Sequence, residues 1–150
     1  MASHLSRFMT SLPSTDVPRP DQLLYFAHET GTTPCAAAET AALRSYFGHA
    51  GAADIVLCST KGLLGHAMGH CFEDVVAVQA LLSGRLIKGH TFSCSCADKE
   101  LAVAGAHQPM HFEPVEVDSA GMAQRTYALH FAAGFGGHMN LTLFKLTHAM

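Results

Sequence analysis

The sequence predicts an α/β domain with helices layered on a mixed sheet. Short apolar runs rich in strand-forming residues alternate with helical segments between residues 23 and 84, and further strand-like segments follow late in the chain. The length of 150 residues fits a single domain. Only 14% of the residues are charged and 49% are hydrophobic, against about 25% charged in an ordinary domain. The low charge suggests that a partner covers part of the surface.

The first strand is expected at Leu23 to His28 (LLYFAH), after a polar, Pro-rich lead-in at 1–21 that we expect to be loosely held. A Thr/Gly turn follows the strand. Residues 35–49 (CAAAETAALRSYFGH) then place apolar side chains at helical spacing, and Gly48 is a plausible helix stop. Residues 54–60 (DIVLCST) predict a second buried strand.

A glycine-rich turn leads from that strand into a helix over 71–84 (CFEDVVAVQALLSG), which is expected to be mostly buried and to end at Gly84. Residues 85–109 are expected to form a mixed loop. The later segments 111–117 (HFEPVEV), 125–133 (RTYALHFAA) and 138–146 (HMNLTLFKL) alternate well enough to be strands.

Composition argues against several classes of protein. The nine Lys and Arg residues are scattered and the net charge is -3, so no nucleic-acid footprint is present. No apolar run approaches the roughly 18 residues that cross a bilayer, and the amino-terminal segment lacks a signal-peptide core. A cytoplasmic location is therefore expected. The five cysteines are odd in number and lack paired CxxC spacing, which favours reduced, mostly buried thiols.

Two histidines occupy comparable places after predicted strands. His28 ends the first strand, and His66 lies in the glycine-rich turn after the second. Ligands of α/β sheets usually bind beyond the carboxyl ends of the strands, where a neutral imidazole can donate a hydrogen bond to an oxygen that gains negative charge. Lys61 lies between the two histidines, and we expect it to pair with Glu39 on the intervening helix.

Other interpretations of these residues remain open. A single histidine is more often a satisfied core residue than a functional one, and two at equivalent strand ends leave both readings open. His66 and His70 are four residues apart with Glu73 nearby, but no third or fourth ligand is evident, so no metal is expected. The other histidines, His130 among them, show no clustering and are interpreted as surface or satisfied core residues.

Three segments carry a resemblance to a known family. Residues 28–48 (HETGTTPCAAAETAALRSYFG), 59–69 (STKGLLGHAMG) and 131–140 (FAAGFGGHMN) resemble, in the same order, the HGTGT, STK…GH…GAAG and FGFGG.N segments of beta-ketoacyl synthases. The resemblance spans 22–150 and implies the C-terminal half of a ketosynthase of fatty-acid or polyketide synthesis. The implied fold is a thiolase-like half-domain with a mixed, five-stranded-type sheet.

In that family a cysteine thiolate carries an acyl chain, and malonyl on an acyl carrier protein loses carbon dioxide and attacks the thioester. The resemblance implies no resident cofactor, because the phosphopantetheine arm of the carrier protein brings the substrate. It assigns catalysis to His28, His66 and Lys61. It implies that the site is supported by Glu39, Thr30, Thr32 and Gly65, and that the substrate pocket is formed by Phe135, Gly134, Gly136 and Gly137.

The sequence also departs from the family. The nucleophilic cysteine of the family belongs to its N-terminal half, and Cys35, which starts a helix, stands where the family has a loop glycine. The family residues are replaced at several further positions, namely Glu29, Ala36, His70, Cys71, Phe72, Ala133 and Met139. We therefore expect a heterodimer in which a separate ketosynthase half supplies the cysteine. The alternative is a non-catalytic, ketosynthase-like subunit that stabilises or shapes a synthase complex.

Overall fold

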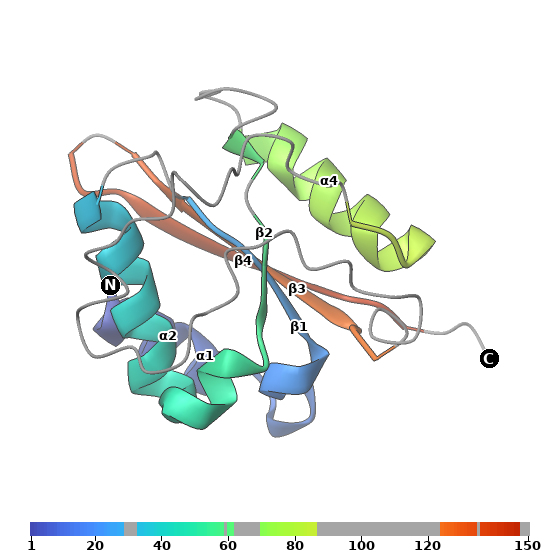
Figure 1. Ribbon diagram of the computed structural model, residues 1–150, viewed down its shortest axis with the longest axis horizontal. Coiled ribbons are helices and arrows are strands. Elements are labelled where there is room, and N and C mark those ends of the chain that lie inside the picture. Colours follow the sequence, from blue (N-terminus) through green and yellow to red (C-terminus); the bar gives the residue numbers. More distant parts are fainter. Residues whose placement is uncertain (29–32, 59, 62–69, 87–123, 135, 148–150) are drawn as a thin grey trace.

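The computed structural model describes residues 1–28, 33–58, 60–61, 70–86, 124–134 and 136–147. These residues form a four-stranded sheet with the order β2-β1-β3-β4. Helices α1 and α2 lie on one face of the sheet and α4 lies on the other (Figure 1). The predicted fold class, helices layered on a mixed sheet, is confirmed. Of the strands predicted from the sequence, 111–117 falls outside the described residues, and the described sheet has four strands instead of the predicted five.

Strand β1 (Leu23–Phe26) lies between β2 (Val56–Cys58) and β3 (Tyr127–Ala133) and runs parallel to both. Strand β4 (Met139–Lys145) pairs antiparallel with β3. All four residues of β1 are buried and apolar. A continuous apolar run is typical of a parallel strand that is covered on both faces.

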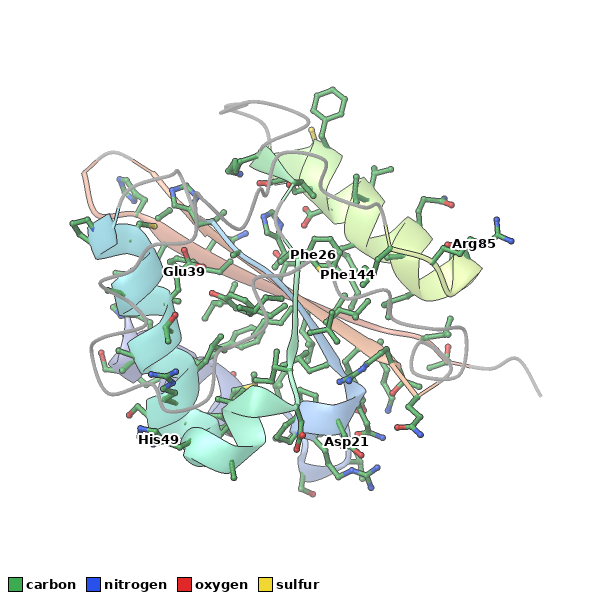
Figure 2. The ribbon with its side chains drawn as sticks, viewed as in Figure 1. Asp21, Phe26, Glu39, His49, Arg85 and Phe144 are labelled. Atoms are coloured by element: carbon green, nitrogen blue, oxygen red, sulfur yellow. The ribbon has the colours of Figure 1, made fainter. Side chains whose placement is uncertain are left out.

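The two faces of the sheet are covered by different helices. Helix α1 (Ala2–Ser11) and helix α2 (Thr33–Ala53) pack over a core that includes Tyr25. Helix α4 (His70–Ser83) packs over Phe26 and Phe144, which point toward it from the sheet (Figure 2). None of the helices in the described part of the chain is both long enough and apolar enough to span a bilayer.

The prediction of a loosely held lead-in was wrong. Leu5 and Met9 of α1 are fully buried in the core under α2. Their spacing of four residues places both on one face of the helix, which explains why the helix is anchored. Short 3₁₀ turns at Ser14–Asp16 and Pro20–Gln22 then lead into β1. The domain start at residue 22 stays a prediction.

Glycines mark the helix ends as predicted. Gly48 has φ 76° and ψ 166°, which breaks α2 before it continues to Ala53. Gly84 follows the last residue of α4 with φ 62°. Residues with side chains rarely adopt positive φ, so glycine is the residue that each position favours.

The prediction that the helix over 71–84 is mostly buried was wrong. Ala77, Ala80 and Leu81 face the sheet, but one side of α4 is open to solvent. Phe72 is 62% exposed, Val75 59% and Leu82 63%. We call these three residues the apolar face of α4. The helix is apolar almost all round, so its sequence pattern alone does not reveal which side the sheet covers.

Arg125 ties together the amino ends of the three parallel strands. Its Nη1 donates hydrogen bonds to the carbonyl oxygens of Asp54, Pro20 and Leu23 at 2.8, 3.1 and 3.5 Å. These contacts lie at the edge of the sheet where the parallel strands begin. The polar side chains described next lie at the opposite edge.

Candidate functional site

The carboxyl ends of β1, β2 and β3 lie at one edge of the sheet, because these strands are parallel. His28 follows β1, and Thr60 and Lys61 follow β2. The turn between β3 and β4 lies at the same edge, where the Gly134 N–H donates to the His138 carbonyl oxygen at 2.8 Å. Gly136 and Gly137 have φ values of 87° and 81°, which this tight turn requires.

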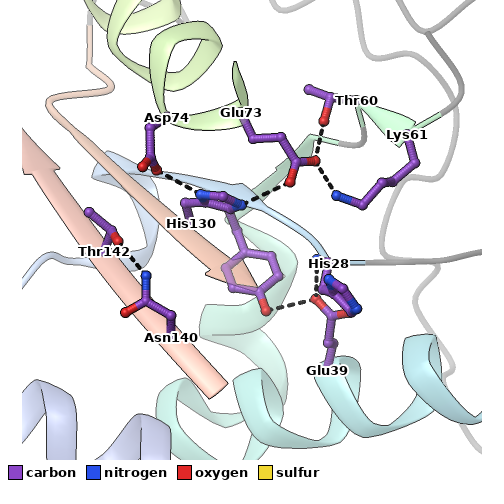
Figure 3. A network of polar contacts seen from close by, with 10 residues as sticks. His28, Glu39, Thr60, Lys61, Glu73, Asp74, His130, Asn140 and Thr142 are labelled. Atoms are coloured by element: carbon purple, nitrogen blue, oxygen red, sulfur yellow. Dashed lines mark hydrogen bonds and ion pairs between the residues drawn. The ribbon is translucent and has the colours of Figure 1, made fainter. Parts of the chain in front are cut away.

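Glu73, in the first turn of α4, contacts several polar side chains at this edge (Figure 3). Its Oε1 accepts hydrogen bonds from Thr60 Oγ1 and Lys61 Nζ, each at 2.5 Å. Its Oε2 lies 3.2 Å from Nε2 of His130, a buried residue of β3. The Lys61 side chain is 11% exposed and that of Glu73 is 5% exposed. The ion pair is therefore largely withdrawn from water.

The surroundings of Glu73 keep its carboxylate charged. Burial alone would raise its pKa, but hydrogen bonds from His130, Lys61 and Thr60 and the charge of Lys61 lower it to about 2. Glu73 is thus an anion at neutral pH and can hold the Lys61 ammonium in one place. The first-turn position adds a favourable interaction with the helix dipole.

Glu39 forms a second polar cluster, at the end of β1. Its Oε2 accepts hydrogen bonds from Tyr25 Oη at 2.8 Å and from the His28 backbone N–H at 3.0 Å. The Cys35 thiol donates to Oε1 at 3.3 Å. Glu39 is 4% exposed, so α2 fixes the end of β1 through a buried carboxylate. The predicted Lys61–Glu39 pair was wrong, because Lys61 pairs with Glu73 across the sheet edge.

The His28 imidazole lies at the carboxyl end of β1. It is half-buried, and its ring contacts the Phe131 ring edge to face, with ring centroids 6.0 Å apart. The backbone of His28 is fixed by Glu39 while its ring is partly accessible. This arrangement can present an imidazole to a ligand bound at the carboxyl ends of the strands.

Residues 9–93 match the family model of the beta-ketoacyl synthase C-terminal domain, which is more than half of the 150 residues. The chain belongs to this family. The matched segment of the ketosynthase domain includes His28, Glu39, Lys61 and Glu73 and ends before β3. Searches among curated proteins and solved structures found no match. The mixed α/β sheet is that of a thiolase-like half-domain.

The structure brings part of the predicted ketosynthase site together. His28, Lys61 and the turn glycines Gly134, Gly136 and Gly137 lie at the carboxyl edge of the sheet, and Glu39 supports the end of β1. The remaining predicted residues lie outside the described part of the chain, namely His66, Thr30, Thr32, Gly65 and Phe135.

The described surroundings of Cys58 and Cys35 are not those of an activated nucleophile. Burial raises the pKa of the Cys58 thiol to about 12, although the charge of Arg125 acts in the opposite direction. Cys35 donates to a carboxylate, whereas reactive cysteines lie beside positive charge. Cys71 is exposed on α4. Among the described residues, no group of three potential ligands is arranged to hold a metal ion.

Sequence reasoning missed Glu73 as the partner of Lys61 and missed the clustering of His130 with two carboxylates. His130 was expected to be a surface or satisfied core residue without clustering. In the structure its ring contacts Glu73 and Asp74. The available signal was a lone ionisable residue inside an apolar strand, which needs a polar partner. Glu73 and Asp74 are the only acidic residues in the helix that covers that strand.

Proposed function

We propose that this ketosynthase domain supplies the two active-site histidines, His28 and His66, for decarboxylative Claisen condensation of acyl and malonyl thioesters in fatty-acid or polyketide biosynthesis. A separate ketosynthase half provides the nucleophilic cysteine, and an acyl carrier protein delivers malonyl on its phosphopantetheine arm. The observation that carries the proposal is the Lys61–Glu73 ion pair, largely withdrawn from water, at the same carboxyl edge of the sheet as His28, in a chain of this family.

The reaction requires charge stabilisation that this edge can provide. When malonyl thioester loses carbon dioxide, the electron pair of the broken C–C bond is left as an enolate, with negative charge on the thioester oxygen. An imidazole N–H from His28 or His66 donates to that oxygen. The carbanion then attacks the acyl thioester on the partner's cysteine, and the thiolate leaves.

Lys61 contributes a fixed positive charge at the same edge of the sheet as His28. Its ammonium is held by Glu73, so its position needs no rearrangement when negative charge develops. Preorganised charge in a partly desolvated site stabilises a transition state better than mobile charge does. Lys61 therefore acts with the histidines in this proposal, and Glu39 and Glu73 act as the groups that fix the strand ends.

The need for a partner chain is supported by the apolar face of α4. Phe72, Val75 and Leu82 leave three large apolar side chains exposed on a helix that otherwise packs on the sheet. Large exposed apolar patches mark interaction sites. The low charge of the whole chain, 14%, agrees with a covered surface.

Reconstitution tests the proposal. The purified chain is mixed with malonyl-loaded carrier protein and an acyl donor, with and without a candidate N-terminal ketosynthase half. Carbon dioxide release and condensed product are measured. We expect both only when the partner is present. Equal turnover without the partner would contradict the split-enzyme proposal.

Histidine variants separate this proposal from the non-catalytic alternative. We expect His28→Ala and His66→Ala to reduce turnover of the reconstituted complex by about 100-fold or more, the size typical of losing an acid–base or oxyanion group. His49→Ala, at an exposed position of α2 (Figure 2), is the matched control. If both active-site variants keep full turnover while omission of the chain abolishes it, the chain is a structural subunit.

A further inference from the structure

We propose that His130 is a positioning residue: as an imidazolium bridging Asp74 and Glu73, it holds the Glu73 carboxylate in the orientation that binds Lys61. The order of Lys61 then depends on one proton held inside the sheet. The catalytic meaning of this coupling rests on the proposed function, whereas the coupling itself is a property of the folded chain.

The geometry places both ring nitrogens of His130 against carboxylates. Nδ1 lies 2.7 Å from Oδ1 of Asp74, and Nε2 lies 3.2 Å from Oε2 of Glu73 (Figure 3). A neutral imidazole has one N–H donor, and an ionised carboxylate only accepts. Both contacts can be hydrogen bonds at once only if both ring nitrogens carry protons. The contacts therefore indicate the charged ring.

The contacts of His130 are largely withdrawn from water. The His130 side chain is 1% exposed and that of Asp74 is 30% exposed. Burial would lower the pKa of His130, but its hydrogen bonds to Glu73 and Asp74 and the charges of these carboxylates more than offset it, so the pKa is raised. The proton is thus held more firmly than in an ordinary histidine.

Within the described part of the chain, the charged groups that contact His130 or its partners come from α4 and from the end of β2. Helix α4 contributes Glu73 and Asp74, and Lys61 reaches Glu73 from the end of β2. In the sheet, the register places Phe26 of β1 and Thr142 of β4 beside His130, and neither is ionisable. Among these described groups, two positive charges oppose two negative ones. Loss of the His130 proton would leave the cluster with an excess negative charge.

Deprotonation would act mainly on Glu73. The shorter contact of His130 is with Asp74, so a neutral ring would keep its single N–H there. The lone pair on Nε2 would then face Oε2 of Glu73 and repel it. Glu73 would lose one of its three side-chain donors, and the orientation of its contact with Lys61 would relax. In this way a proton on β3 affects a cation that follows β2.

NMR titration of the full chain tests the coupling without requiring turnover. The ring ¹⁵N signals of His130 report its protonation, and the ε-¹³C signal of Lys61 reports its surroundings. We expect a His130 midpoint above the ordinary value of 6.5 and an inflection of the Lys61 signal at the same pH. A His130 ring that is neutral at pH 6, or a Lys61 signal that ignores the titration, would overturn the inference.

Substitutions make the test specific. Asp74→Asn removes one carboxylate at a partly exposed position, and we expect it to lower the His130 midpoint by about one pH unit or more. Asp74→Glu retains the charge and should restore most of the midpoint. His130→Gln should abolish the Lys61 inflection, whereas His49→Gln on the surface of α2 should leave it unchanged. Equal midpoints in Asp74→Asn and the wild type would contradict the proposed bridge.

The outcome is separable from that of the proposed function. A chain that shows the coupling but forms no product with any partner refutes the proposed function and leaves the bridge standing. If the reconstituted complex is active, its pH–rate profile should lose its alkaline limb in His130→Gln. An active complex whose limb is unchanged in that variant would show that His130 does not position the site.

Discussion

Glu73 contacts donors from two other segments of the chain. Thr60 and Lys61 approach it from the end of β2 and His130 approaches from β3, while Glu73 itself lies on α4. A single carboxylate therefore fixes the distance between a helix start and two strands. Because these groups are largely withdrawn from water, removal of the Glu73 carboxylate would leave Lys61 without its anion and His130 with one carboxylate partner fewer.

Substitution of Glu73 tests how much its carboxylate contributes to the stability of the fold. We expect Glu73→Gln to lower the free energy of unfolding by about 3–5 kcal/mol, since Lys61 and His130 are then left buried without their shared anion. The matched control is Asp21→Asn, which breaks the exposed pair with Arg19 and should cost about 1 kcal/mol or less. Urea unfolding followed by circular dichroism measures both. An equal loss of unfolding free energy in the two variants would contradict the stabilising role assigned to Glu73.

The same residues predict how stability changes with pH. The pKa of Glu73 is lowered from 4.5 to about 2, so its contribution is present above pH 4.5 and is lost as the pH falls toward 2. The pKa of His130 is raised above 6.5, so its contribution is present below pH 6.5 and is lost as the pH rises through the raised value. The combined contribution should be largest between pH 4.5 and 6.5.

Thermal unfolding across pH measures this contribution. We expect His130→Gln to have a lower melting temperature than the wild type at acidic pH. The difference should shrink as the pH rises above the His130 midpoint, because the wild-type imidazolium then loses its proton and its charge. A difference in melting temperature that stays constant from pH 5 to pH 9 would exclude the linked proton.

At the scale of single elements, the break in α2 depends on backbone conformation. A Cβ added at Gly48 would contact nothing within 4 Å, so there is room for a side chain. Its φ of 76° and ψ of 166° nevertheless lie in a region that is nearly restricted to glycine. We expect Gly48→Ala to destabilise the protein by about 1–3 kcal/mol.

A surface substitution on the same helix serves as the comparison. Ser45→Ala lies at an exposed position one turn earlier and should change stability by less than about 0.5 kcal/mol. Chemical denaturation of the two variants separates backbone strain from a general sensitivity of α2. If Gly48→Ala were as stable as Ser45→Ala, the helix would have to bend differently from the structure.

The sequence predicted these elements better than it predicted their contacts. Apolar runs and glycines located β1, β2, β3, β4 and both helix stops, because strand and helix periodicities are local properties. The same reasoning placed His28 and Lys61 at strand ends. It could not tell that Glu73, and not Glu39, meets Lys61, because the choice depends on how α4 crosses the sheet. The contacts of His130 with Glu73 and Asp74 were missed for the same reason.

At the scale of the whole molecule, the amino and carboxyl ends of the parallel strands are held together by different kinds of contact. Arg125 holds the amino ends of the parallel strands through neutral carbonyl groups, whereas the carboxyl ends are joined by charged side chains. The apolar face of α4, formed by Phe72, Val75 and Leu82, is exposed to solvent. The carboxyl edge, where we propose the chemistry, and the apolar face, where we propose the partner contact, therefore meet at the start of α4.

The apolar face gives a prediction about assembly. We expect Phe72→Ser combined with Leu82→Ser to weaken binding of the partner half by at least 100-fold, because both side chains would be buried at the contact. Folding of the chain should be nearly unaffected, since both residues are exposed. Ser45→Ala, at an exposed position of α2 on the other face of the sheet, is the control. Analytical ultracentrifugation with the partner distinguishes loss of assembly from loss of folding.

The place of β3 in the sheet also determines how the chain can be shortened. The family match ends at residue 93, yet β3 (Tyr127–Ala133) pairs along one whole side of β1. A fragment that stops at residue 93 would leave an apolar strand with a row of unpaired N–H and C=O groups, which is a template for aggregation. The unit that folds is therefore larger than the segment recognised by the family. A usable fragment must keep the last two strands, either in the same chain or as a second, co-expressed piece.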